Sequence, residues 1–210
     1  TRMRVYDAGY SWVTHSVQPK HIEDTDFRIR IGGKSCLKPY SASIYNISAM
    51  SFGSLSANAI SALNKGAAQG GFAHDTGEGG ISRYHREGGG DLIYEIGSGY
   101  FGCRTDDGRF SPEKFTKQAA NDQIKMIELK LSQGAKPGHG GMLPAAKITR
   151  EIADARGVPM GQDCVSPASH SAFSTPVEMM QFLGQLRDLS GGKPVGFKLC
   201  IGHQREFMCM

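Results

Sequence analysis

The chain alternates short apolar runs with amphipathic helical patterns, and this alternation begins near residue 44. Residues 44–50 (Ile-Tyr-Asn-Ile-Ser-Ala-Met) predict a strand. Ser56 is placed to cap a following helix that carries Ile60 and Ala67 on one face. Residues 71–74 then predict a second, short strand.

The same alternation continues along the rest of the chain. After a glycine-rich excursion that ends near residue 110, a helix is predicted to start at Ser111, where proline takes the first helical position. Another is predicted to start at Thr175, whose capping box includes Glu178, and residues 144–156 have helical periodicity. Three more strands are predicted, over residues 123–131, 161–165 and 194–200.

Repeated strand–helix units of this kind are typical of parallel α/β folds. We therefore expect an α/β fold of the (β/α)8 TIM-barrel type, which takes about 250 residues and binds ligands at the carboxyl ends of its strands. With 210 residues, the chain would form an incomplete barrel, with about five of the eight strands. We assign this partial barrel to residues 43–210 and expect residues 1–42 to be an N-terminal leader that packs on it.

Composition narrows the classes of function. The formal net charge is +4 and the Lys and Arg residues are scattered, which argues against nucleic acid or a membrane surface as a partner. No apolar run approaches the ~18 residues of a membrane-spanning helix. The five cysteines have neither metal-ligand spacing nor a compact disulfide pattern, so we expect reduced thiols, a cytoplasmic location and no metal site.

Two glycine-rich turns each contain a charged side chain. Residues 74–80 read His-Asp-Thr-Gly-Glu-Gly-Gly, and residues 133–141 read Gln-Gly-Ala-Lys-Pro-Gly-His-Gly-Gly. Glycine lets the backbone adopt positive φ and approach a ligand closely. The two turns therefore indicate a site where a flat ligand lies against backbone and faces an acid or a base. Residues 97–102 predict a loop packed over this site.

Each candidate for this chemistry also has a plainer interpretation. Glu78 could hold an imine or transfer a proton, or it could be a solvated turn acid. Lys136 could hold a carboxylate or a flavin's negative charge, or it could be a surface lysine. Lys198 could point into a barrel mouth or lie exposed at a sheet edge. Residues 48–56 could be a backbone platform or a helix cap, and His139 fits a hydrogen-bonded spacer better than a proton carrier.

Seven segments, in this order along the chain, resemble the FMN-binding synthase domain of glutamate synthase. They are residues 50–56, 76–80, 97–102, 123–126, 133–141, 163–167 and 196–199. The resemblance implies an FMN-containing barrel that reduces 2-iminoglutarate, made from 2-oxoglutarate and ammonia, to L-glutamate. Hydride transfer from the reduced flavin would supply the electrons.

The resemblance also implies roles for residues at matched positions. Glu78 and Lys136 would be catalytic, with Glu78 facing the substrate nitrogen and Lys136 facing a 2-oxoglutarate carboxylate. The cofactor-binding residues would be Met50, Ser51, Gly53, Ser54 and Lys198, the last beside the pyrimidine edge of the flavin. Arg156 also matches a family arginine, but a position at a helix end would put it on the far side of the barrel, away from the site.

The sequence departs from the larger synthases of the family. His139 and Met142 stand where those proteins carry an acid and an amide, so another oxo or imino acid is an alternative substrate. The pattern resembles the stand-alone branch, which lacks a glutaminase domain. The iron–sulfur cysteines and the phosphate-binding glycine loop would lie beyond Met210, so we expect a C-terminally truncated domain that binds FMN weakly.

The resemblance implies two kinds of partner. One is a small-molecule substrate, 2-oxoglutarate or a similar acid, and the other is an electron donor, either a reduced pyridine nucleotide partner or ferredoxin. The alternative from a different class is a non-catalytic remnant that binds no flavin.

Overall fold

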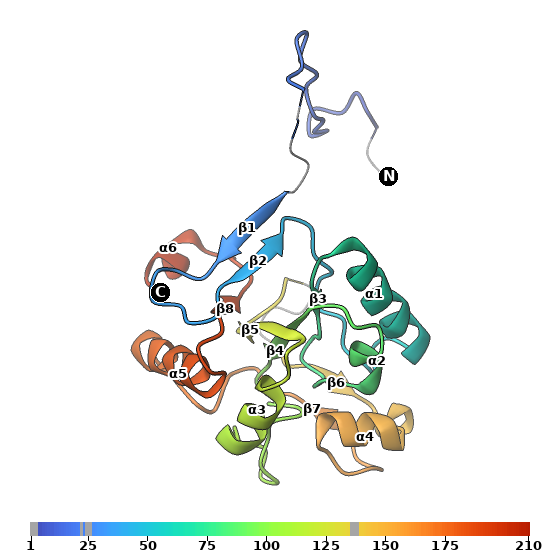
Figure 1. Cartoon of the computed structure of the whole chain (residues 1–210). Helices are drawn as coiled ribbons and strands as arrows, with labels where there is room; N and C mark the ends of the chain where they lie inside the picture. The colour runs from blue at the N-terminus through green and yellow to red at the C-terminus, as the bar shows by residue number, and fades with distance from the viewer. Residues whose placement is uncertain (1–3, 22, 24–26, 135–138) are drawn as a thin grey trace.

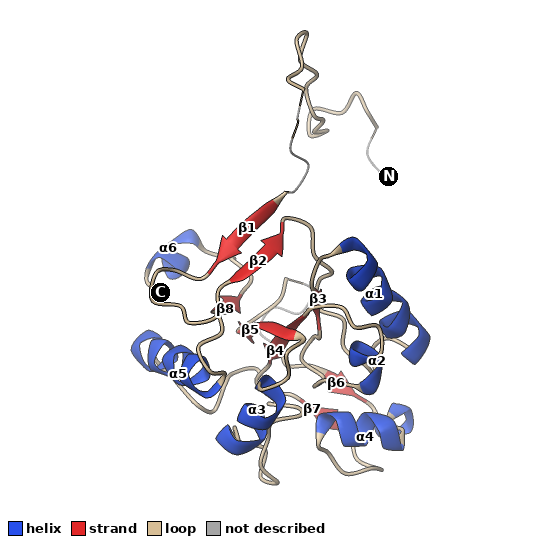
Figure 2. Cartoon of the chain, viewed as in Figure 1, coloured by secondary structure: helices blue, strands red, loops and turns tan. Residues whose placement is uncertain are grey.

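The computed structural model describes residues 4–21, 23, 27–134 and 139–210. Its centre is a parallel sheet of four strands, in the order β3 (His74–Asp75), β4 (Leu92–Ile96), β5 (Ile124–Lys130) and β8 (Val195–Lys198). Helices surround these strands (Figures 1 and 2). The strands lie across the sheet in the order of the chain, as in β/α repeats, although β6 and β7 come between β5 and β8 and pair separately. The architecture confirms the α/β class and is compatible with part of a (β/α)8 barrel.

The main helices start where the sequence signals predict. Helix α1 (Ala57–Gly70) follows Ser56, whose Oγ accepts a hydrogen bond from the backbone N–H of Ala59. Helices α3 (Pro112–Ala119) and α5 (Pro176–Leu189) both begin with proline after a capping Ser or Thr. The shorter helices are α2 (Arg83–Arg86), the 3-10 helix η1 (Ala145–Lys147), α4 (Arg150–Arg156) and α6 (Gln204–Met208). Among the described residues, no helix is both long and apolar enough to cross a bilayer.

The prediction of strands was wrong in two places. Residues 161–165 do not join the parallel sheet, because β7 (Cys164–Val165) pairs antiparallel with β6 (Met142–Leu143). The central strand β4 instead comes from the stretch that was predicted to be a glycine-rich excursion. Its five residues, Leu-Ile-Tyr-Glu-Ile, are mostly apolar and buried, and this short run lies among glycines that favour a loop in the sequence.

The first predicted strand, residues 44–50, is represented by a parallel bridge between Ile47 and His74. The N–H of Ile47 donates to the carbonyl of Ala73 at 2.9 Å, and the N–H of Asp75 donates to the carbonyl of Ile47 at 3.0 Å. This segment therefore runs beside β3 and delivers residues 50–54 to the carboxyl end of the sheet.

The two faces of the sheet differ in chemistry because successive side chains of a strand point to opposite sides. One face is apolar: Tyr94, Ile96, Ile127 and Leu129 are buried in one cluster with Phe115 of α3 and with Leu183 and Leu186 of α5. The other face is charged toward its carboxyl end. Its side chains there are Asp75, Glu95, Glu128, Lys130 and Lys198.

A hairpin covers the amino-terminal part of the charged face. It consists of β1 (Arg28–Ile31) and β2 (Tyr40–Ser43), and its Tyr40 and Ala42 pack with Ala73, Ile93 and Met126. The Tyr40 hydroxyl donates to Asp91 Oδ2 at 2.7 Å. Residues 4–21 run outside the body of the structure, where Trp12 and Val13 are exposed (Figure 1). That all of residues 1–42 form a packed leader stays a prediction.

Three histidines are buried in this fold. His85 bonds to the side chain of Ser82 and to the carbonyl of Met50, and His170 bonds to the carbonyl of Lys130. His74 is fully buried, and neither of its ring nitrogens has a hydrogen-bond partner within the described residues. Burial, with a smaller contribution from His85, lowers the pKa of His74 to about 4.

We predict that His74 makes the fold sensitive to acid. Its pKa is lower in the folded than in the unfolded chain, so unfolding takes up a proton and stability falls as the pH falls from about 6.5 toward 4. Replacement with phenylalanine keeps an aromatic ring and removes the titratable group. It breaks no hydrogen bond, because the ring nitrogens of His74 have no partner among the described residues. Between pH 7 and pH 5 the wild type should lose about 2 kcal/mol more stability than His74→Phe in urea unfolding. The exposed His203→Phe variant should keep the wild-type pH dependence; equal losses in all three proteins would contradict this assignment.

Candidate functional site

Two backbone segments meet at the carboxyl end of the sheet. The turn after β3 packs against residues 50–54, and the N–H of Met50 donates to the carbonyl of Asp75 at 3.1 Å. Gly77 has φ 66°, and a Cβ added there would lie 2.6 Å from the backbone nitrogen of Ser51. A Cβ on Gly79 would lie 3.2 Å from the Cβ of Ser51. The glycines are therefore required for this close contact between two loops.

Glu78 points into the site from this turn. It lies between two glycines, since a Cβ on Gly97 would be 2.8 Å from its Oε2 and a Cβ on Gly141 would be 3.1 Å from its Oε1. Its Oε1 forms an ion pair with Lys130 Nζ at 3.0 Å, and the two side chains are only 21% and 11% exposed. Glu78 is thus a paired, largely buried acid in this structure and not a solvated turn residue.

Lys198 also faces the site. Its ammonium forms ion pairs with Glu95 and, at 3.5 Å, with Glu128. Lys198 stands in register with Lys130 on the neighbouring strand β5, so both lysines project from the same face. Burial acts to lower the pKa of Lys198, but the carboxylates of Glu95, Asp75 and Glu128 outweigh it and raise the pKa. Lys198 is therefore a cation held over the charged face of the sheet.

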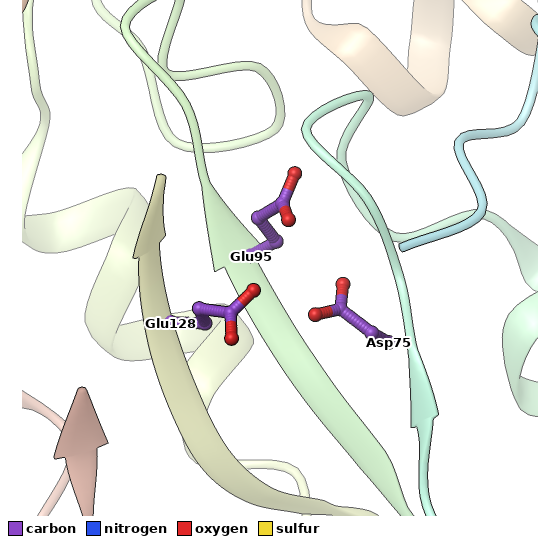
Figure 3. A group of neighbouring side chains, drawn as sticks. All are labelled: Asp75, Glu95 and Glu128. Carbon is purple, nitrogen blue, oxygen red and sulfur yellow. The ribbon is translucent and has the colours of Figure 1, made fainter. Parts of the chain in front are cut away.

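Three carboxyl groups, from β3, β4 and β5, lie close together on the charged face of the sheet (Figure 3). One ligand atom each of Asp75, Glu95 and Glu128 lies within 4.8 Å of the others. Burial and then the two glutamates raise the pKa of Asp75 well above its usual value. Burial also raises the pKa of Glu95 to about 7, although Lys198 opposes this shift. Carboxyl groups this close to one another disfavour ionisation of all three at once.

The same three carboxyl groups could ligate a hard cation, because their oxygen atoms are close enough to share one. The fold already places a cation there, since Lys198 pairs with two of the three acids. The Lys198 ammonium offsets part of the negative charge of this cluster.

Arg156 lies in the site, so the expectation that it would be on the far side was wrong. It is 5% exposed; its Nη2 donates to the carbonyl of Phe52 at 3.2 Å, and its guanidinium lies 5.1 Å from the centre of the Phe101 ring. Its Nε is buried without a hydrogen-bond partner among the described residues. The reason is topological. Helix α5, not α4, leads back to the last strand of the sheet, and α4 packs with Phe52 and Phe101 at the site.

A signal for Arg156 was available in the sequence. Arg156 lies four residues after Ile152, so it falls on the face of α4 that buries Ile152. An arginine on the apolar face of a short helix is buried with its charge and needs a partner. The sequence does not mark three more residues of the site, Glu95, Glu128 and Lys130, because charged residues along a strand can equally well face solvent.

The other predicted residues are distributed as follows. Met50, Ser51 and Gly53 are partly buried in the loop beside Gly77, whereas Ser54 is exposed. Lys136 lies outside the described residues. His139 and Met142 are exposed, and His139 lines a cavity of about 30 Å³ together with Glu78, Lys130 and Ser166.

The structure therefore brings several predicted residues to one end of the sheet. Ser51 contacts the turn that carries Glu78, and Glu78 pairs with Lys130. Lys130 lies in register with Lys198, which pairs with Glu95. The roles of these residues in catalysis or cofactor binding stay predictions.

We predict that Gly77→Ala disrupts the contact between the two loops. The added Cβ must move the backbone of Ser51 in addition to straining a residue at φ 66°. Gly89→Ala is the matched control, because Gly89 has φ 74° and an added Cβ there meets nothing within 4 Å. Gly77→Ala should lower the free energy of unfolding by about 1–3 kcal/mol more than Gly89→Ala in urea titrations. Equal losses would show that backbone strain, and not the packing on Ser51, accounts for the effect.

Comparison with known proteins agrees with the segment pattern. Residues 22–210 match the family model described as the conserved region in glutamate synthase. The glutamate synthase large subunit-like protein YerD of Bacillus subtilis is 46% identical over 190 residues, which cover 90% of this chain and 36% of that protein. The archaeal-type glutamate synthase [NADPH] of Thermotoga maritima is 35% identical over 156 residues, covering 74% of this chain and 28% of that protein.

A further relative is the archaeal glutamate synthase [NADPH] of Methanocaldococcus jannaschii. It is 35% identical over 158 residues, which cover 75% of this chain and 28% of that protein. The aligned part of the chain thus spans between 28% and 36% of the length of these curated relatives. With a family match over most of its residues, the chain belongs to the glutamate synthase family.

Proposed function

We propose that the chain is part of an FMN-dependent oxidoreductase that reduces 2-iminoglutarate, formed from 2-oxoglutarate and ammonia, to L-glutamate. The observation that carries this proposal is the convergence of Glu78, Lys198 and Arg156 at the carboxyl end of a parallel sheet. Parallel β/α folds bind their ligands at this end. The names of the relatives support glutamate synthesis as the reaction of the longer protein.

The proposed fold of the longer protein is a (β/α)8 barrel. Helices α3 and α5 cover the apolar face of the sheet. The opposite face carries charges, and the β1–β2 hairpin covers its amino-terminal part. In a (β/α)8 barrel, too, the helices cover one face of a parallel sheet and the functional groups gather at the carboxyl ends of its strands. Further strands would extend it beyond β8.

The residues of the site fit FMN as a cofactor. Lys198 offers a positive charge, and the loop at residues 50–54 offers backbone groups beside partly buried small side chains. FMN supplies hydride chemistry when it is bound. Within this proposal, Met50, Ser51, Gly53 and Ser54 line the flavin, and Lys198 stabilises negative charge at its pyrimidine edge. The carboxyl groups of Glu95 and Glu128 hold the Lys198 ammonium in place.

The substrate would be held by groups of opposite charge. The guanidinium of Arg156, with a buried Nε that lacks a partner in the described part of the chain, suits a carboxylate of 2-oxoglutarate. Lys136 is the second proposed carboxylate ligand. Glu78 would hold the substrate nitrogen and move its proton. The cavity of about 30 Å³ beside Glu78 has the size of one water molecule, which suits ammonia equally well.

The names of two relatives help to choose between the two proposed electron donors. Two of the relatives named above include NADPH in their names, which supports a reduced pyridine nucleotide partner over ferredoxin. An iron–sulfur cluster would belong to the longer protein, beyond Met210. We also propose a cytoplasmic location, in line with five cysteines that form no disulfide.

We predict that Lys198 contributes to flavin binding through its charge. Lys198→Met should weaken FMN binding about tenfold in a fluorescence titration, because it removes one charged contact and leaves Glu95 without its ion-pair partner. Lys198→Arg keeps the charge, so its affinity for FMN should fall less than threefold. The titration also compares this chain with one extended to the length of its relatives. Equal loss of FMN affinity in the two Lys198 variants would argue against an electrostatic role of this residue. Equally tight FMN binding by the two chain lengths would overturn the expectation that the 210-residue chain binds FMN weakly.

We predict that Glu78 is needed for catalysis. In the longer protein, chemically reduced flavin should be reoxidised anaerobically by 2-oxoglutarate plus ammonia, with glutamate as the product. Glu78→Gln should slow this step about 100-fold or more, since it removes a proton-transferring group. The exposed Glu113→Gln variant should keep the wild-type rate. Reoxidation by a different oxo acid, with no glutamate formed, would favour the alternative substrate that His139 and Met142 suggest.

A further inference from the structure

A second, larger cavity lies apart from the candidate site. It has a volume of about 700 Å³ and opens between α3 and α4, which are neighbours in Figure 1. Four basic residues line it and a single acid, Asp154, faces them. The basic residues are Arg86, Arg104, Lys114 and Lys117.

The positive charge of this cavity is not neutralised. Within the described residues, none of its four basic side chains forms an ion pair with a carboxylate. Like charges that share one concave wall repel each other, and this repulsion costs stability unless an anion binds there. The cavity therefore has the electrostatics of an anion-binding site.

Three of the four cations also make contacts that position them, whereas Lys117 is exposed. The Nη2 of Arg86 donates to Gln118 Oε1 at 2.5 Å, and Lys114 Nζ donates to the carbonyl of Arg104 at 2.8 Å. The guanidinium of Arg104 lies 5.4 Å from the centre of the Phe101 ring. The Nε of Arg86 is buried and has no hydrogen-bond partner in the parts of the chain that the structure describes. Such preorganised donors lose little entropy when they bind a ligand.

We propose that this cavity binds a small molecule that carries a di- or triphosphate group. Its volume lies within the range of about 300–1,000 Å³ that small-molecule sites occupy. Two guanidinium groups and two ammonium groups match several phosphate oxygens at once. Apart from Ile81, few large apolar side chains line the wall, so recognition runs through the phosphates and not through a stacked ring.

The cavity shares a piece of backbone with the candidate site. Ala155 and Gly157 line the cavity, while the side chain of Arg156, between them, lies in the site. The N–H of Gly102, another residue of the wall, donates to the carbonyl of Arg156 at 2.9 Å. A ligand in the cavity would therefore touch the backbone that positions Arg156. This consequence rests on the proposed function, whereas binding itself does not.

The test is calorimetric titration of the purified chain with pyrophosphate and with ADP at low salt. Lys114→Gln combined with Lys117→Gln should weaken both about tenfold or more. The matched control combines Lys65→Gln with Lys147→Gln, which removes the same charge from exposed positions elsewhere, and its affinity should equal that of the wild type. Sulfate at matched ionic strength and a poly-glutamate peptide are titrated in parallel.

Several outcomes would overturn the proposal. These are no binding of pyrophosphate or ADP by the wild type, equal weakening by the control pair, and tighter binding of poly-glutamate, which would indicate an acidic protein partner instead.

Amide NMR shifts give a readout on the unmodified protein. Pyrophosphate should shift Gly102, Arg104 and Gly157 more than residues 28–43; uniform or absent shifts would contradict the site. None of these measurements uses flavin or the glutamate-forming reaction, so failure here is distinct from failure of the proposed function.

Discussion

The structure depends on the balance of charge on one face of a parallel sheet. Strand register places Glu95 opposite Glu128 and Lys130 opposite Lys198, so acids and bases form successive rows across neighbouring strands. A buried carboxylate without a partner is very costly, whereas paired and hydrogen-bonded groups are tolerated. A shift of one residue in register would turn these charges into the apolar cluster beneath α3 and α5. Burial on one face and charge pairing on the other therefore specify the same register.

This arrangement explains how a site can be rigid without a disulfide. Lys198 is held by two glutamates, Glu78 by Lys130, and Arg156 by the carbonyl of Phe52. Each charged group is thus fixed by partners on a different segment. The glycines of the turn after β3 let two backbones touch, which closes the site on the side of residues 50–54. Preorganised charges of this kind are what catalysis at a flavin or a carboxylate requires.

The sequence predicted the parts of this structure that depend on local signals. Ser56, Ser111 and Thr175 cap helices because their side chains accept backbone N–H groups, and this chemistry is visible in a few consecutive residues. The strands at β5 and β8 were also found, β5 from its alternation of polar and apolar residues and β8 from a short, mostly apolar stretch. Glu78 and Lys198 were singled out because a charge beside glycine or within an apolar strand is unusual.

The parts that depend on tertiary contacts were not predictable in this way. Strand β4 is flanked by glycines, and its place in the centre of the sheet follows from pairing with β3 and β5. Arg156 was assigned to the wrong side because a helical pattern does not reveal which helix returns the chain to the sheet. The cluster of Asp75, Glu95 and Glu128 joins residues from three strands, and no spacing in the sequence marks it.

The hairpin of β1 and β2 has a consequence for the order of folding. Cys36 Sγ contacts the carbonyl of Gly192 across a separation of 156 residues, and the N–H of Lys38 donates to the same carbonyl. Contacts between such distant positions form late, because a long loop must close before they contribute. The loop between β1 and β2 can therefore dock on Gly192 only after nearly the whole chain has been made, whereas the two strands can pair and pack on Ala73, Ile93 and Met126 much earlier.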